Sequence, residues 1–345
     1  MRVALVAPPF IPVPPVEYGG TELFIADLAR GLQAVGVQPI VYTNGESSVD
    51  VERRWLFEKS QWPIKGDAYN HLKDMEHATW AIHDASGSCD ILHMNTVFGL
   101  IPSRLSRLPL VYTVHCPTDR QLSALYARFP EVNYVCISND QRKRETLPKL
   151  HTIHHGINLS KYHLQTDKQD YLSFIGRIAP IKGTHLAIEI AKRAGIPLKI
   201  AGEVQPEYRD YFEAKVKPHI DGKFIEYAGL ADLAAKNELL GNSMAMLFPI
   251  KWDEPFGLVM VEAMACGTPV LALRAGSVPE IVKDGVSGYI ARNIDALVRR
   301  VQDLRLVPAE IRGYVEQNFS QERMARDYCA LYTRILDESR DSYSV

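Results

Sequence analysis

Short apolar runs alternate with amphipathic patterns through the first 157 residues. The apolar runs predict buried strands at residues 3–7, 39–43, 91–94, 110–114 and 134–137. Between the first two runs, residues 21–35 repeat apolar side chains with a helical period, at Leu23, Phe24, Ala26, Leu28 and Leu32. Strands that alternate with helices in this way predict a parallel sheet with helices on both faces.

The same alternation restarts near residue 170. Strands are predicted at residues 171–175, 198–201, 224–227, 245–248 and 269–273, with a helix over 184–194. The polar segment 158–169 is expected to link the two halves. We therefore expect an α/β fold of two doubly wound, Rossmann-like domains, residues 1–157 and 158–320, with ligands at strand ends facing a cleft. The helical pattern at 322–336 predicts that residues 321–345 cross back onto the first domain.

Composition limits the class of protein and of partner. The 39 Lys and Arg residues nearly balance the 41 Asp and Glu residues, which argues against a nucleic-acid binder. No apolar run is long enough to span a bilayer, no signal peptide is visible, and the five scattered cysteines suit a reduced cytoplasmic protein. Basic clusters at 53–57 and 142–144 leave peripheral membrane contact open, although solvated helix faces explain them equally well.

Two carboxylates carry the most specific chemical signal. Glu254 lies in a Pro/Gly turn, and Glu262 follows inside an apolar run, where an acid is costly without a partner. Pro255 suits a first helical turn, and residues 267–269 end the helix. A continuous helix would separate the two acids by roughly 12 Å, about the length of a sugar diphosphate that ends in a ribose. A surface turn and a solvated acid are the alternative interpretation.

Basic residues and glycines at the start of the second half predict an anion site. Gly176 and Arg177 end a predicted strand, and Lys182 with Gly183 and Thr184 opens the next helix. Two cations near a helix N-terminus suit a diphosphate, although a solvated surface loop is the alternative. No Asp-x-Asp pair follows a strand to hold a metal ion, so we expect a metal-independent mechanism without a cofactor.

The first half offers two further candidates. Gly19 and Gly20, in the loop 17–22 after the first strand, expose backbone amides at a helix N-terminus, although plain turn glycines are the alternative. His115 follows the strand 110–114, where a neutral imidazole could donate to a sugar hydroxyl or steady developing charge. A lone histidine is more often structural. A Cys116 nucleophile and a metal site at residues 151–155 are disfavoured interpretations.

Together these residues resemble the family-4 retaining glycosyltransferases of GT-B fold. The matching elements run in family order over residues 1–300: the Gly19-Gly20 loop, His115, residues 176–183, residues 254–262, and residues 276–285. The resemblance implies an acceptor-side first domain and a second domain that binds the nucleotide sugar. The segment 201–203, Ala-Gly-Glu, departs from the family, in which many members have a further glycine two residues on.

The resemblance also implies roles for individual positions. Glu254 and His115 are the expected catalytic residues that orient the sugar. Arg177, Lys182 and the Gly19-Gly20 loop would contact the diphosphate, and Glu262 would hold the ribose. The remaining implied contacts are the amides of Phe256, Gly257 and Leu258 with the donor sugar, Glu203 and Leu230 with the base, and Ser138 and Asn139 with the acceptor.

The expected reaction is transfer of a hexose from a nucleotide diphosphate sugar, with retention through departure and attack on one face. UDP-glucose or a similar UDP-hexose is the first candidate donor, and GDP-mannose is the second. The acceptor class stays open among carbohydrate, lipid-linked and small-molecule acceptors. Two rivals remain: an epimerase or hydrolase of nucleotide sugars on the same fold, and a non-catalytic protein that binds them.

Overall fold

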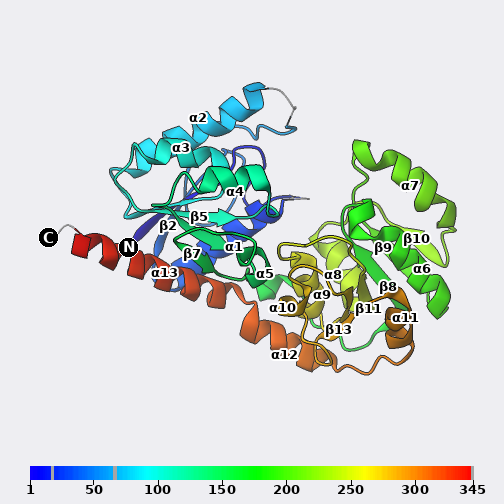
Figure 1. Cartoon of the computed structure of the whole chain (residues 1–345). Coiled ribbons are helices and arrows are strands. Elements are labelled where there is room, and N and C mark those ends of the chain that lie inside the picture. The colour runs from blue at the N-terminus through cyan, green and yellow to red at the C-terminus, as the bar shows by residue number, and fades with distance from the viewer. Residues whose placement is uncertain (17–18, 65–67, 343–345) are drawn as a thin grey trace. The chain divides into compact units, whose positions relative to one another are not determined.

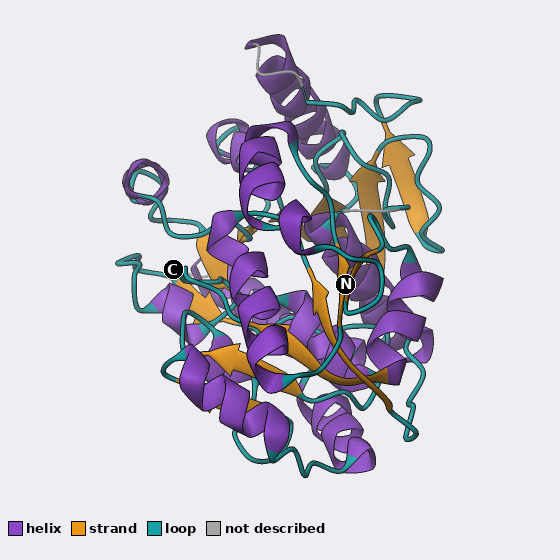
Figure 2. Ribbon diagram, turned by 90° about the vertical axis from the view of Figure 1, so that its right-hand side faces the viewer, coloured by secondary structure: helices purple, strands orange, loops and turns teal. Residues whose placement is uncertain are grey.

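The computed structural model describes residues 1–16, 19–64 and 68–342, and the chain divides into two compact units. The first unit contains residues 1–157 and 321–345, and the second contains residues 158–320. Each unit has one parallel sheet flanked by helices (Figures 1 and 2). The prediction of two doubly wound α/β domains is therefore confirmed.

The first unit has a seven-stranded sheet in the order β3-β2-β1-β4-β5-β6-β7. Its strands are β1 (Arg2–Val6), β2 (Gln38–Thr43), β3 (Glu52–Trp55), β4 (Ile91–Met94), β5 (Leu110–Val114), β6 (Asn133–Cys136) and β7 (Leu150–Thr152). Its helices are α1 (Gly20–Ala34), α2 (Ala68–Ala85), α3 (Leu100–Ser103), α4 (Arg120–Tyr126), α5 (Asn139–Arg142) and α13 (Gln321–Ser342). All strand pairs are parallel, so the carboxyl ends of the strands lie along one edge.

Alternation of side chains along the strands builds a separate core on each face of this sheet. On β1, Val3 and Leu5 pack with helices α1 and α13, whereas Ala4 and Val6 pack with helix α2. Gly31 permits the close approach of α1 to α13, because a Cβ atom there would lie 2.8 Å from the Cβ of Ala325. The C-terminal helix is thus part of the core of the first unit.

The second unit has a six-stranded parallel sheet in the order β10-β9-β8-β11-β12-β13. Its strands are β8 (Gln169–Ile175), β9 (Leu198–Ala201), β10 (Ile225–Tyr227), β11 (Ser243–Phe248), β12 (Val270–Leu273) and β13 (Gly288–Ala291). Its helices are α6 (Thr184–Ala194), α7 (Arg209–Lys215), α8 (Leu233–Asn242), α9 (Leu258–Ala265), α10 (Val278–Ile281), α11 (Ile294–Gln302) and α12 (Pro308–Asn318). Helices α6 and α11 cover one face of the sheet through a common apolar core.

The structure corrects three details of the sequence interpretation. The basic cluster at 53–57, which the sequence left open between membrane contact and a solvated helix face, begins on strand β3, where Arg54 pairs with Asp84 and Glu52 at 2.5 and 2.7 Å. Charged residues are common on an edge strand, where they oppose pairing with another chain. Short strands β7 and β13 were also missed. The segment 158–169 packs within the second unit, where Tyr162 is only 3% exposed.

Candidate functional site

The candidate anion site of the second unit forms where β8 and β9 end. A Cβ atom on Gly202 would lie 1.8 Å from the carbonyl oxygen of Gly176, so only glycine allows these two loops to approach. Arg177 donates to Gln205 Oε1 at 3.2 Å and lies over the ring of Tyr208. The Arg177 Nε atom is buried and has no hydrogen-bond partner among the described residues, so the guanidinium retains donors for an anion.

Lys182 and Glu254 meet at the start of helix α6. Lys182 ends a short 3₁₀ turn, and Gly183 then adopts a left-handed conformation, with φ of 76°, as the N-cap of the helix. The Lys182 ammonium donates to Glu254 Oε2 at 2.5 Å and lies 4.7 Å from the centre of the Trp252 ring. Trp252 Nε1 donates to the same oxygen at 3.0 Å. Two predicted site residues, 72 positions apart, are therefore in direct contact.

The loop before α10 holds the turn that carries Glu254 through two hydrogen bonds from Ser277. The backbone nitrogen of Ser277 donates to the carbonyl of Glu254 at 3.0 Å, and its hydroxyl donates to the carbonyl of Phe256 at 2.8 Å. Phe256 is buried, Gly257 is the left-handed N-cap of α9, and Leu258 is the first helical residue. The prediction that Pro255 opens this helix is wrong, because Gly257 turns the chain before it starts. The 12 Å helical spacing therefore does not apply.

Glu262 is buried inside α9 and forms an ion pair with Lys236. Its carboxylate accepts from the ammonium of Lys236 at 2.9 and 3.0 Å and from the Tyr162 hydroxyl at 2.9 Å. These three bonds use three of about four acceptor positions on a carboxylate. One position on Oε2 remains for a further hydroxyl group.

The two positions that the resemblance linked to the base follow adjacent strands. Glu203 lies just after β9, where its carbonyl accepts from the backbone of Ile178 at 2.9 Å. Leu230 follows β10 and is 52% exposed. The Gly202 amide donates to the carbonyl of Gly229 at 2.7 Å, which ties the two loops together at the same edge of the sheet.

His115 lies at the carboxyl edge of the first unit. Its Nε2 atom is 2.9 Å from Asn95 Oδ1, while the Asn95 amide nitrogen donates to the carbonyl of Val6. Nε2 therefore carries the proton, so the ring offers Nδ1 as an acceptor and not the free donor expected from the sequence. The ring stacks on His155, and burial lowers its pKa to about 3, so it is neutral.

Two other candidate residues of the first unit, Gly19 and Ser138, are the N-caps of helices. Gly19 is the N-cap of α1, and a Cβ atom there would lie 2.7 Å from Glu22 Oε2; residues 17 and 18 lie outside the described residues. Burial raises the pKa of Glu22 to about 7. Ser138 is buried and caps α5 by accepting from the Gln141 amide at 3.1 Å, whereas Asn139 is exposed.

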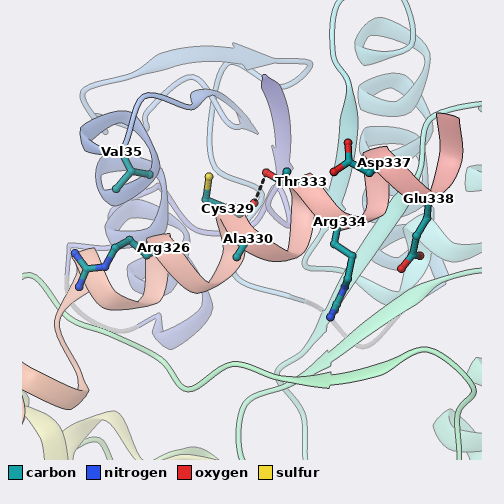
Figure 3. A pocket seen from close by; sticks show the side chains of 8 residues that line it. All are labelled: Val35, Arg326, Cys329, Ala330, Thr333, Arg334, Asp337 and Glu338. Carbon is teal, nitrogen blue, oxygen red and sulfur yellow. Dashed lines mark hydrogen bonds between the residues drawn. The ribbon is translucent and has the colours of Figure 1, made fainter. Parts of the chain in front are cut away.

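A surface depression on the first unit lies apart from these residues. Figure 3 shows that α13 supplies most of its lining, including Arg326, Thr333 and Asp337, with Val35 at its margin. It contains none of the predicted site residues. Among the described residues, no group of three His, Cys, Asp or Glu side chains is placed to hold a metal ion. None of the described helices has the length and apolar character that crossing a membrane requires.

Sequence reasoning missed several partners of the candidate residues. Lys236 and Tyr162 hold Glu262 from 26 and 100 positions away, and no local pattern links them. Asn95, the partner of His115, did carry a signal, because it follows directly on the apolar run of β4. Trp252, two residues before Glu254, was also within reach of local reasoning.

Two glycosyltransferase families match the chain in succession. The family described as Glycosyltransferase Family 4 matches residues 18–161, and Glycosyl transferases group 1 matches residues 158–318. The chain therefore belongs to the family-4 glycosyltransferases of GT-B fold, and it is a glycosyltransferase.

Individual relatives support the same family. Spore coat protein SA of Bacillus subtilis is 22% identical, and the match covers 97% of this chain and all of that protein. D-inositol 3-phosphate glycosyltransferase of Mycolicibacterium smegmatis is 26% identical over 81% of this chain and 76% of its own.

Solved structures share the fold. Sucrose-phosphate synthase of Thermosynechococcus elongatus superposes with a TM-score of 0.80 at 18% identity, over 98% of this chain and 99% of its own. HepE of Anabaena, in complex with UDP and glucose, superposes with a TM-score of 0.74 at 18% identity, over 97% and 100% of the two chains.

Proposed function

We propose that this glycosyltransferase moves a hexose from a nucleotide diphosphate sugar to an acceptor, with retention and without a metal ion. The contact between Lys182 and Glu254 at the start of α6 carries the proposal, together with Arg177 in the loop that follows β8. UDP-glucose is the first candidate donor, with GDP-mannose second; the structural relative HepE, solved with UDP and glucose, supports that order.

The cations are suited to the leaving diphosphate. Lys182 uses one ammonium hydrogen on Glu254 and keeps two, and Arg177 keeps most of its five donors. The N-terminus of helix α6 adds a partial positive charge through the helix dipole. These groups stabilise negative charge as the bond between sugar and phosphate breaks, in place of a divalent cation.

Glu254 is suited to orient the sugar. Lys182 and Trp252 both donate to Oε2, and no bond among the described residues uses Oε1. Oε1 can therefore accept a sugar hydroxyl while the other two contacts hold the carboxylate in place. Glu262 would accept a ribose hydroxyl on Oε2, because its three existing hydrogen bonds leave one acceptor position on that oxygen.

For a front-face reaction, the acceptor oxygen bonds to the anomeric carbon on the side that the diphosphate leaves. The acceptor proton passes to the leaving phosphate oxygen, so no enzyme carboxylate is needed as a nucleophile. His115, with Nδ1 as an acceptor, is suited to hold a hydroxyl of the reacting sugar.

The test measures UDP release and product mass with UDP-glucose and a mixed acceptor panel, with and without EDTA. Glu254→Gln and Lys182→Ala should each lower transfer by about 10²- to 10³-fold. Lys217→Ala, which breaks the exposed pair with Glu213 in the same unit, is the control and should keep full activity. Near-normal transfer by both site variants would contradict the assignment, and donor turnover without transfer would favour a hydrolase or epimerase.

Separate experiments test the stereochemistry of transfer and its independence of metal ions. Proton NMR of the first product formed should show the anomeric configuration of the donor. Product of the opposite configuration would overturn retention. Loss of transfer with EDTA, restored by magnesium or manganese, would overturn metal independence. Tight donor binding without any turnover across the panel would favour a binding protein.

A further inference from the structure

The ring of His115, the candidate sugar-binding residue of the first unit, meets two other aromatic rings. The His155 ring lies at 25° to it, with 5.6 Å between the two ring centroids, so these rings are stacked. The ring of Phe24, on α1, lies at 65° to the His115 ring, with 4.9 Å between centroids, and 4.6 Å from the centroid of His155. Each ring therefore contacts the other two, at separations typical of favourable aromatic pairs.

The three rings differ in their access to a ligand. Phe24 is 1% exposed and His155 is 4% exposed, whereas His115 is only partly buried. A ligand at the carboxyl edge of the sheet can therefore reach His115 but neither of its two neighbours. Phe24 and His155 can affect a reaction only through the position of the His115 ring.

The hydrogen bond to Asn95 does not by itself fix the plane of the His115 ring. Asn95 Oδ1 accepts from Nε2 at 2.9 Å, which selects the tautomer and the edge of the ring that faces Asn95. Rotation about χ2 stays soft, because the energy of this torsion has a broad minimum in histidine. The stacked His155 ring and the nearly perpendicular Phe24 ring supply the missing constraint, since a tilt of the His115 ring would lose one contact or clash with the other.

Helix α13 contacts both neighbours of the His115 ring. The Arg323 guanidinium donates to the backbone carbonyl of His155 at 3.0 Å. The centroid of the Tyr328 ring lies 5.9 Å from that of Phe24, and the Tyr328 hydroxyl lies 2.8 Å from the hydroxyl of Thr113 on β5. The two neighbouring rings are therefore held by the core of the first unit.

We propose that Phe24 and His155 are positioning residues for the reaction, which hold the His115 ring so that Nδ1 meets a hydroxyl of the reacting sugar. The proposal rests on the proposed function, because it explains how His115 is held for that reaction. A misplacement of about 1 Å at a reacting group costs about 10²-fold in rate. Donor affinity depends mainly on the cations of the second unit, so loss of either ring lowers kcat and leaves the KM for the donor nearly unchanged.

The experiment compares wild type with His155→Leu and Phe24→Leu, each of which removes one ring and keeps an apolar side chain. With UDP-glucose and the acceptor identified in the mixed panel, kcat should fall by about tenfold or more in both variants, while the KM for UDP-glucose stays within about threefold. Phe129→Leu, the same change in the other core of this unit, is the matched control and should keep full kcat. His155→Phe restores a ring and should recover most of the lost kcat.

Several kinetic results would overturn the positioning role. They are a wild-type kcat in both folded variants, a higher KM for UDP-glucose with kcat unchanged, an equal loss of kcat in Phe129→Leu, or no recovery in His155→Phe. Should one ring variant fail to fold, the other decides. Should both fail, Arg323→Lys removes the guanidinium that bonds the His155 carbonyl, and the same fall in kcat is expected; full kcat in this variant would overturn the role.

Nitrogen NMR of the free protein, labelled in histidine, tests the ring cluster without any turnover. The His115 signal is assigned by its loss in His115→Gln, and in wild type it should show one tautomer, protonated at Nε2. The two ring variants should show a mixture of tautomers, because a tilting ring weakens the bond to Asn95. If wild type transfers no sugar, the proposed function fails by itself, and an unchanged His115 signal in both variants would refute the positioning role.

Discussion

Removing the ammonium that neutralises Glu262 should destabilise the second unit severely. Lys236→Met keeps most of the apolar stem but leaves a carboxylate that is 4% exposed with only the Tyr162 hydroxyl. Breaking a buried ion pair by removing one partner costs about 3–5 kcal/mol. Because Lys236 itself is 22% exposed, water can partly replace it, and we expect about 3 kcal/mol, the lower limit of that range.

The assay is urea and thermal unfolding of the full chain, followed by a signal from the second unit. A loss of about 3 kcal/mol lowers the Tm of a domain of this size by about 6–12 °C. The double variant Lys236→Met/Glu262→Gln removes the charge as well and should recover part of the loss. Lys217→Met, in an exposed pair, is the control and should cost at most about 1 kcal/mol. An unchanged Tm for Lys236→Met, or a double variant no more stable than the single, would refute the reasoning.

Two other predictions concern the dependence of stability on pH and the backbone geometry at Gly202. Burial lowers the pKa values of His93 and His115 to about 3, so each stabilises the fold fully above pH 6.5 and loses about 1.4 kcal/mol per pH unit as pH falls toward 3. Glu22 and Asp74, whose pKa values burial raises to about 7 and about 6, act in the opposite direction. His77 and His151, whose pKa values burial lowers to about 4, add to the loss, so urea unfolding should show falling stability from pH 6.5 to 5, and a rise would contradict this. Gly202→Ala should cost about 3 kcal/mol or more, because its Cβ would lie 1.8 Å from a carbonyl oxygen. Gly229→Ala, left-handed but in open space, should cost about 1 kcal/mol, and equal losses would refute the steric argument.

Most strands of the two sheets could be predicted from the sequence, because parallel strands that are buried on both faces form continuous apolar runs. Ten of these runs were predicted, and each falls on an observed strand, as 91–94 does on β4. The three missed strands lack that signal. Strand β3 reads Glu-Arg-Arg-Trp, since an edge strand meets solvent and carries charge. Strands β7 and β13 are also terminal in their sheets and short.

Within the candidate site, local patterns indicated the residues but not their contacts. Glu254 and Lys182 were expected to bind one ligand, and their direct ion pair was not foreseen. A helix start is set by backbone conformation, and the left-handed Gly257 moved the start of α9 three residues beyond Pro255. The proton on His115 Nε2 depended on Asn95 and Val6, which only the folded sheet brings together.

The position of α13 has a consequence for how the protein is made. The core around α1 needs Tyr328, Tyr332 and Ile335, which leave the ribosome only after residues 158–320. At bacterial or eukaryotic synthesis rates this interval is roughly 10–30 s. The second unit is continuous and can finish folding during that time, whereas on one face of the first-made sheet the apolar core has α1 but still lacks α13. Early termination near residue 320 would therefore leave the domain that was synthesised first with an incomplete core.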